Sequence, residues 1–187
     1  LMQGKTEIAT TQTDGQGNYS FEGAPAGLYN VVAGKDGVTK TILVELTNAN
    51  AAGKNVQMPE GNKNSVVEVK NNTPAVVVGG VDAVAEAETV TVKLTVEKKD
   101  SPPDKTEIDH AAQGRTVELY LDLSLVKTVA SSGGGTTSTD ITDTGDKVLE
   151  IVVPYDFTNK TDVMVYRKHG AENAAALTSL SSAPAAP

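Results

Sequence analysis

The chain of 187 residues carries a net charge of −8, and its residues are 39% hydrophobic but only 4% aromatic. The negative charge argues against nucleic acid and anionic membranes as partners. Because the sequence has no cysteine, disulfides and thiolate metal sites are excluded. No run reaches the roughly 18 apolar residues that span a bilayer, so we expect no membrane insertion in this segment.

The first third of the chain alternates short apolar runs with turn residues. Asp14-Gly15 and Gly17-Asn18 tolerate the positive φ of tight turns. Tyr19-Ser20-Phe21 alternates as a half-buried strand does. The expected strands are Glu7–Thr13, Asn18–Glu22, Leu28–Ala33, Thr39–Thr47 and Lys54–Met58.

One longer pattern runs through this region, T-x-T-D-x-x-G-x-Y-x-F-x-x-x-P-A-G-x-Y-x-V from Thr11 to Val31. It resembles the carboxypeptidase-regulatory-like domain, a prealbumin-like β-sandwich akin to the B-type repeats of Gram-positive collagen adhesins. The resemblance implies a non-catalytic β-sandwich over residues 1–60. Its usual first strand is missing before Leu1, so we expect an exposed edge that another chain could pair with.

A second domain is expected over residues 64–182, after the polar linker Pro59–Asn64. Its clearest strand is Thr89–Lys98, where apolar residues alternate with polar ones, as in an antiparallel sheet with one wet face. The other expected strands are Ser65–Lys70, Ala75–Val78, Arg115–Val129, Lys147–Val153, Asp162–Lys168 and a return through Ala174–Leu180.

Two segments of this second region are expected to be something other than strand. Pro102–Gly114 begins with prolines and ends in glycine, which predicts one short helix. Ser131–Thr139 is rich in glycine and serine, so we expect a mobile hairpin tip. The predicted fold class is therefore all-β, with two prealbumin- or immunoglobulin-like β-sandwich domains, the second carrying one short helix.

The second region also has a looser resemblance to β-rich modules found beside surface-layer-homology domains in Firmicutes surface proteins. The similar stretches are Val117–Val129, Leu149–Phe157 and Val163–Gly170. Such modules usually continue past the point where this chain stops, so we expect its closing strands to be missing as well.

The sequence offers no catalytic, cofactor-binding or metal-binding motif. A zinc peptidase site needs about three clustered ligands, whereas His110 and His169 lack that spacing and are expected to be exposed. The loop at Asp14 superficially suggests a calcium site but lacks the EF-hand spacing, so we interpret it as a turn. The acidic group Asp140, Asp143 and Asp146 is interpreted as solvated charge. We predict a protein that is not an enzyme and needs no cofactor.

Carbohydrate binding is the serious alternative, because sugar-binding β-sandwiches stack a pyranose on exposed aromatic rings. We expect the rings of Tyr19, Phe21 and Tyr29 to lie in the first core. Tyr120 lies opposite a leucine stripe and is expected to be exposed. The candidate ligand contacts are Tyr120, Tyr155, Phe157 and Tyr166, although the last three could instead close the end of the second sandwich.

These observations favour a non-catalytic spacer or adhesion segment of a bacterial, Gram-positive, extracellular or cell-surface protein. Its expected partners are a cell-wall glycan or a host or surface protein. The alternatives are a carbohydrate- or protein-binding module, or an accessory domain of a secreted hydrolase. Exposed coplanar aromatic rings would favour a glycan, and a contiguous apolar patch would favour a protein partner.

Overall fold

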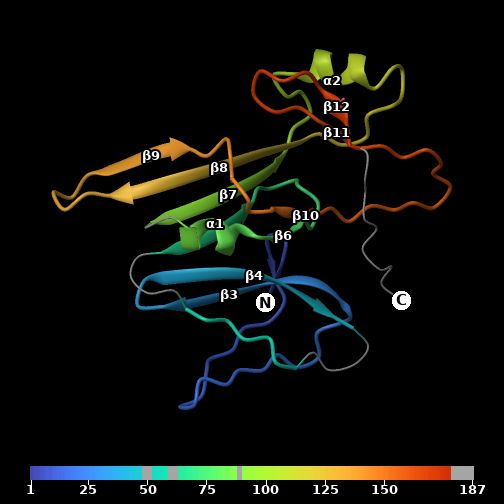
Figure 1. Cartoon of the computed structure of the whole chain (residues 1–187). Helices are drawn as coiled ribbons and strands as arrows, with labels where there is room; N and C mark the ends of the chain where they lie inside the picture. Colours follow the sequence, from blue (N-terminus) through green and yellow to red (C-terminus); the bar gives the residue numbers. More distant parts are fainter. Residues whose placement is uncertain (48–51, 59–62, 88–89, 178–187) are drawn as a thin grey trace.

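A computed structural model describes residues 1–47, 52–58, 63–87 and 90–177, and it is mostly β with several small sheets (Figure 1). Residues 59–62 of the predicted linker, Thr89 and the end of the last predicted strand lie outside the described residues. No helix in the described part of the chain is long and apolar enough to cross a bilayer.

The N-terminal sheet is built on one long hairpin. Its four strands are ordered β2-β1-β3-β4 and run antiparallel. Asp36 and Gly37, with φ of 51° and 79°, make the two-residue turn of the hairpin. The strands are β1 (Met2–Gln3), β2 (Thr6–Glu7), β3 (Gly27–Lys35) and β4 (Val38–Leu46). The sequence prediction is confirmed for β3 and for β4, the strand of this region with the clearest alternation.

Three predicted N-terminal strands are largely wrong. Glu7–Thr13 contributes only Glu7 to a strand, and neither Asn18–Glu22 nor Lys54–Met58 is one. A side-chain bond links two of these segments, since the Tyr19 hydroxyl donates to the Lys54 carbonyl. Tyr19 and Phe21 still pack against a core formed by the buried residues Leu1, Tyr29, Val31 and Val44. The predicted aromatic core is thus confirmed without its strands.

The second sheet has the order β5-β7-β8-β9. Its strands are β5 (Asn64–Val69), β7 (Thr91–Lys98), β8 (Leu121–Ala130) and β9 (Thr136–Asp140). In β7, Val92, Leu94 and Val96 are buried while the residues between them are half-buried, which confirms the predicted alternation. The antiparallel arrangement expected for this sheet is wrong for one pair, because β5 and β7 run parallel, whereas the other two pairs are antiparallel.

The connection between the parallel strands β5 and β7 contains a helix that was not predicted from the sequence. A parallel connection must cross over the sheet, and the chain does so through β6 (Val77–Gly79) and α1 (Val81–Ala87). Helix α1 buries Val81, Val84 and Ala85 in the core beside Leu94. The prediction of one helix is therefore wrong, because the described residues hold two.

The predicted mobile tip at Ser131–Thr139 is also corrected. Residues Thr136–Asp140 form β9, which pairs with β8 along its whole length. The turn is confined to the segment between Ser131 and Gly135, whose backbone groups bond at 2.8 Å. The resulting β8–β9 hairpin projects from the body at the left of Figure 1.

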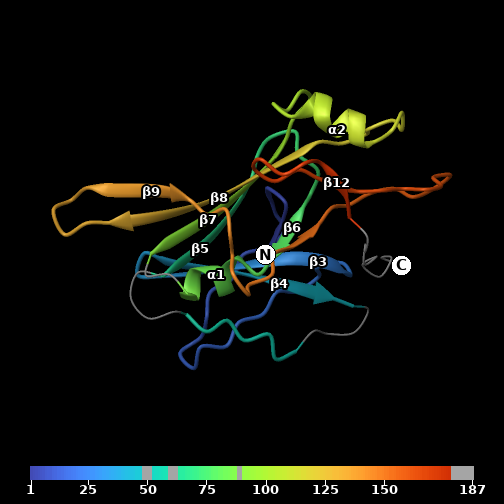
Figure 2. The ribbon, with the colours of Figure 1, turned by 45° about the horizontal axis from the view of Figure 1, so that its top comes forward.

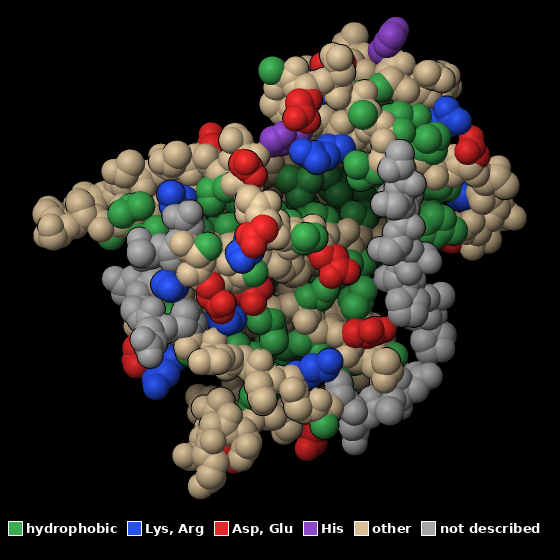
Figure 3. Space-filling view, viewed as in Figure 1, with side chains coloured by type: hydrophobic (Ala, Val, Ile, Leu, Met, Phe, Trp, Pro, Cys, Tyr) green, Lys and Arg blue, Asp and Glu red, His purple; other side chains and the backbone are tan. Residues whose placement is uncertain are grey.

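The C-terminal region forms two small pairs and meets the second helix. Strand β10 (Glu150–Val152) pairs with β6, and β11 (Tyr166–Arg167) pairs with β12 (Ala175–Ala176). Helix α2 (Lys105–Ala111), which confirms the predicted helix, lies beside the β11–β12 pair (Figures 1 and 2). Figure 3 shows hydrophobic side chains gathered in a hollow between this end and the body.

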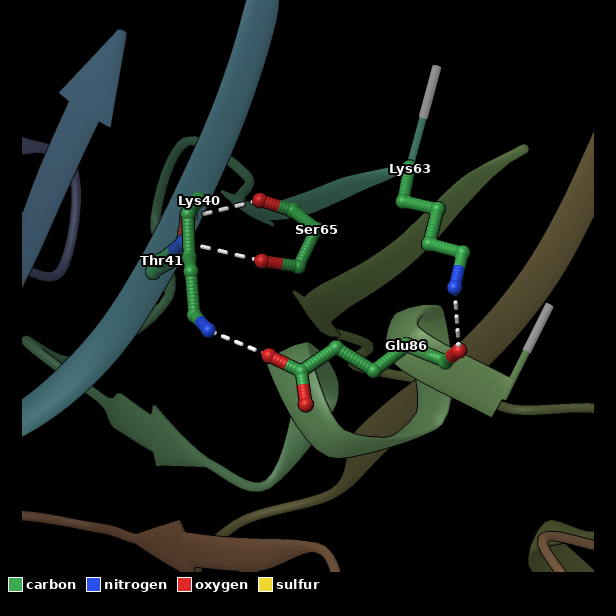
Figure 4. Close-up of polar contacts among 5 residues, drawn as sticks. All are labelled: Lys40, Thr41, Lys63, Ser65 and Glu86. Carbon is green, nitrogen blue, oxygen red and sulfur yellow. Dashed lines mark hydrogen bonds and ion pairs between the residues drawn. The ribbon is translucent and has the colours of Figure 1, made fainter. Parts of the chain in front are cut away.

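Buried polar groups join the N-terminal sheet to the rest of the chain. Thr41 N–H donates to Ser65 Oγ and Thr41 Oγ1 donates to the Ser65 carbonyl, both at 2.9 Å (Figure 4). Beside them the Lys40 ammonium, with a side chain 9% exposed, pairs with Glu86 of α1. The outer edge of β4 is therefore covered by side chains of β5. The division into two domains stays a prediction.

Candidate functional site

An open groove of about 500 Å³ lies where five segments of the chain meet. These are the β1–β2 turn, the loop after β5, the end of β7, the segment before β8 and the loop after β10. The lining residues are Lys5, Asn72, Thr73, Pro74, Lys98, Glu118, Leu119, Pro154 and Tyr155. Tyr155, one of the four aromatic residues singled out from the sequence, is the one that lines this groove.

Tyr155 is held in place by a carboxylate from a distant part of the chain. Its hydroxyl donates to Glu118 Oε2 at 2.5 Å, and the Lys160 ammonium pairs with the other oxygen of Glu118. The hydrogen bonds from Lys160 and Tyr155 lower the pKa of Glu118. The Glu118 carboxylate in turn raises the pKa of Tyr155, because it stabilises the protonated phenol. The hydroxyl end of the Tyr155 ring is thus anchored to Glu118.

Phe157 extends this aromatic surface. Its ring packs edge-on against Tyr155, with centroids 4.9 Å apart and an interplanar angle of 74°. The side chain is 61% exposed, so Phe157 is not a core residue. The pair presents one ring within the groove and a second beside it. Because the rings are inclined rather than coplanar, they could not both stack on one flat sugar ring.

The groove is also lined by two lysines, Lys5 and Lys98. Lys5 Nζ donates to Asn71 Oδ1 at 3.1 Å, which ties the β1–β2 turn to the loop after β5. Thr73 Oγ1 accepts the Lys98 N–H at 2.8 Å and closes that loop onto β7. Two lysines and one glutamate therefore line a polar groove in a chain whose overall charge is −8.

Tyr120 lies elsewhere and is less accessible than predicted. It is half-buried, and its hydroxyl donates to Asp109 on α2. The Lys105 ammonium sits over the ring, 5.2 Å from the centroid, and also pairs with Asp109. One face of the ring is thus occupied by a cation. The prediction of an exposed Tyr120 is wrong, because α2 folds back over it.

Tyr166 is likewise outside the groove. It is half-buried in β11, and its hydroxyl lies 3.6 Å from the sulfur of Met164. Arg115 lies beside it and pairs with Asp162 at 2.8 Å. The structure therefore brings together Tyr155 and Phe157 of the four predicted contacts and places Tyr120 and Tyr166 apart from them.

The loop at Asp14 has the geometry of a turn, as predicted. Asp14 Oδ1 accepts the N–H groups of Gln16 and Asn18 at 2.9 and 2.8 Å, and Oδ2 accepts the Asn18 amide at 3.0 Å. These bonds lower the pKa of Asp14, the side-chain bond from Asn18 most strongly. The carboxylate is thus engaged by its own loop.

The remaining sequence candidates lie at the surface or close to it. Asp140, Asp143 and Asp146 are all exposed, and Asp143 accepts a backbone bond from Gly145 at 2.8 Å. His110 is exposed as predicted. His169 is half-buried rather than exposed, and its Nδ1 lies 3.9 Å from a carboxylate oxygen of Glu172.

Sequence reasoning missed most of the groove for a simple reason. Lys5, Lys98 and Glu118 are separated by long stretches of chain and form no local motif. The two aromatic residues that lie two positions apart, Tyr155 and Phe157, were the one signal available. No protein-family model, curated protein or solved structure matches this chain. The interpretation of the groove therefore rests on its own residues.

Proposed function

We propose that the chain is a non-catalytic structural segment of a bacterial cell-surface or secreted protein, in which two β-sandwich domains hold a functional part away from its anchor. Such a segment must resist bending where its parts meet. The observation that carries the proposal is the buried polar joint between the N-terminal sheet and the rest of the chain.

That joint uses matched donors and acceptors instead of a purely apolar contact. Asn30, Thr41 and Ser65 are at most 3% exposed, and each makes hydrogen bonds across the joint. Breaking such a bond without water access costs about 1–3 kcal/mol for each group left unpaired. Sliding or hinging at this point would break several bonds together, so the joint supports a stiff connection.

The cellular part of the proposal rests on the resemblances to surface-protein modules of residues 11–31 and of the stretches Val117–Val129, Leu149–Phe157 and Val163–Gly170. An antibody raised against the purified chain tests it on cells of the source organism. Labelling of intact cells, or signal in the culture medium, is expected. Signal that appears only after lysis would contradict an extracellular role, and an antibody against a cytosolic protein serves as the control for leakage.

A second candidate function is glycan binding, and the Tyr155–Phe157 pair beside the groove favours it. Aromatic rings contribute affinity by packing on sugar C–H groups, and the flanking lysines could bond hydroxyl or acidic groups. Glycan binding would suit a wall-attached spacer, and it would equally suit an accessory domain of a secreted hydrolase. The groove would then bind one sugar on Tyr155, with Phe157 flanking it.

A panel of bacterial wall and host glycans, screened by NMR shift changes, tests this second candidate. Binding should perturb groove resonances and should weaken strongly in Tyr155→Ala and Phe157→Ala. Tyr120→Ala is the matched aromatic control outside the groove and should retain binding. Equal losses in all three variants, or no perturbation of the groove, would contradict the assignment.

A further inference from the structure

Strand β9 forms a free edge of the second sheet on a projecting hairpin. All five of its residues, Thr136–Asp140, are exposed. It packs mainly on β8, and in both views of the ribbon no other described segment lies along its outer side (Figures 1 and 2). The surface of the hairpin is largely uncharged in the space-filling view (Figure 3).

The hydrogen-bond pattern shows which backbone groups of β9 point outward. Ile141 N–H donates to the Leu125 carbonyl at 2.8 Å, and Ser131 N–H donates to the Gly135 carbonyl at 2.8 Å. Bonding alternates along an antiparallel ladder, so Thr137 and Thr139 bond to β8. The backbone N–H and C=O groups of Thr136, Ser138 and Asp140 therefore point away from the sheet.

This edge lacks the usual protection against pairing. Natural edge strands often carry lysine, proline or a bulge, whereas β9 reads Thr-Thr-Ser-Thr-Asp and pairs with β8 in unbroken register. The outer edge of β4 offers a contrast within this chain. There the N–H groups of Thr39 and Thr41 donate to side chains of Asn64 and Ser65.

We propose that β9 pairs with β9 of a second copy of this chain, in an antiparallel arrangement centred on Ser138. In this register Ser138 faces Ser138 of the second copy, and Thr136 faces Asp140. All three outward-pointing residues then fall in hydrogen-bonded pairs. Each such pair exchanges two bonds, so the contact would form about six backbone hydrogen bonds and join the two sheets into one.

The side chains make a second copy a better partner than an arbitrary strand. Thr137 of one copy faces Thr139 of the other, and Thr–Thr pairs are favourable across strands. The two Asp140 carboxylates lie at opposite ends of the pair, four residues or roughly 14 Å apart at the strand rise. That separation exceeds the screening length of about 8 Å at physiological salt. This register therefore gives hydrogen-bond partners to the outward backbone groups of β9 without placing like charges opposite one another.

The contact is limited to one short strand from each copy, so the dimer should be weak and concentration-dependent. Stable interfaces usually bury more than about 1,000 Å², and an edge contact of this length buries less. Attachment of many copies to one surface would raise the local concentration and favour the pairing. A spacer that self-associates through β9 could link neighbouring molecules laterally.

Sedimentation velocity over a range of concentrations tests the pairing directly. The unaltered chain should show a monomer–dimer equilibrium at high concentration. Ser138→Pro removes the central outward N–H, which β8 does not use, and should abolish the dimer. Ser138→Ala is the matched control, because it loses the same side-chain contact with Thr128 but keeps the N–H, and it should still dimerise. A monomeric unaltered chain, or an undiminished dimer in Ser138→Pro, would overturn the proposal.

Two charged variants test whether the partner of β9 is a second β9, even if the proline variant fails to fold. Ser138→Lys and Ser138→Glu each place like charges opposite one another in the symmetric pair and should each be monomeric. A mixture of the two should form a heterodimer that salt weakens. Homodimers of either variant alone, or no association in the mixture, would overturn the symmetric register.

Discussion

The side chain of Asn30 acts as a strand partner for Val78. Asn30 Nδ2 donates to the Val78 carbonyl at 2.7 Å, and Asn30 Oδ1 accepts the Val78 N–H at 3.2 Å. Asn30 lies in β3, while Val78 lies in β6, whose other edge pairs with β10. One amide group therefore completes the hydrogen bonding of a buried strand and fastens the N-terminal sheet to the second core.

Replacing Asn30 by alanine should destabilise the fold by about 2–6 kcal/mol. The change leaves both backbone groups of Val78 without a partner in a buried position, and each unpaired group costs about 1–3 kcal/mol. Urea unfolding followed by circular dichroism measures the loss. Asn18→Ala, which removes an exposed side-chain bond to Asp14, should cost less than about 1 kcal/mol. Equal losses for the two variants would refute the role of Asn30.

Gly80 should tolerate no side chain. Its φ is +89°, and a Cβ atom there would lie 1.9 Å from the Val148 carbonyl oxygen. Gly80→Ala must shift the backbone between β6 and α1, so we expect a loss of about 3 kcal/mol or more in unfolding free energy. Gly133→Ala is the control, since open space surrounds that position. A thermal midpoint for Gly80→Ala equal to that of the control would contradict this account.

The elements that the sequence predicted best are those whose burial is periodic. In β7 the apolar residues from Val92 to Val96 alternate strictly, and the Asp36-Gly37 turn suits the β3–β4 hairpin. The sequence missed β9 because its threonines and serine face solvent, so pairing with β8 rather than an apolar face holds the strand. Helix α1 was missed because seven residues give too little periodicity, and its presence depends on the parallel crossover.

The residues of the groove, too, could be predicted from the local sequence only in part. Tyr155 and Phe157 could be named as candidate contacts from the sequence because aromatic residues are few in this chain. Glu118, which orients Tyr155, comes from a segment 37 residues away in the chain. Contacts over such separations depend on the packing of several elements at once, which local pattern does not encode.

Glu68 should make the protein less stable in acid. Its hydrogen bonds with Lys70 and Lys93 lower its pKa from 4.5 to about 2. A carboxyl group with a depressed pKa in the folded state contributes stability above its unfolded pKa, and that contribution is lost as pH falls through the folded value. Between pH 4.5 and 2 the Glu68 contribution should therefore decline.

Urea unfolding of the native chain and Glu68→Gln across this range measures the effect. The native chain should lose more stability than the variant between pH 6 and pH 3. The difference should be modest, because Glu68 and both lysines are partly exposed. Parallel pH profiles for the two proteins would show that Glu68 is not the titrating group.

The hydrogen bond between Glu118 and Tyr155 can be tested by measuring the pKa of the Tyr155 phenol. Glu118→Gln removes the carboxylate that raises the pKa of Tyr155, so this pKa should fall toward its ordinary value. Phenolate absorbance, with Tyr155→Phe used to assign the signal, measures the shift. Asp143→Asn, in a separate loop, should leave it unchanged. An unaltered Tyr155 titration in Glu118→Gln would contradict the hydrogen bond.

The stiffness of the joint between the N-terminal sheet and the rest of the chain is the central claim. Backbone 15N relaxation at low protein concentration, where β9 pairing is negligible, tests it most directly. The account predicts one rotational correlation time for β3 and β4 and for β5 and β7. A distinctly shorter correlation time for β3 and β4 would mean that the N-terminal sheet moves independently, and it would contradict a stiff structural segment.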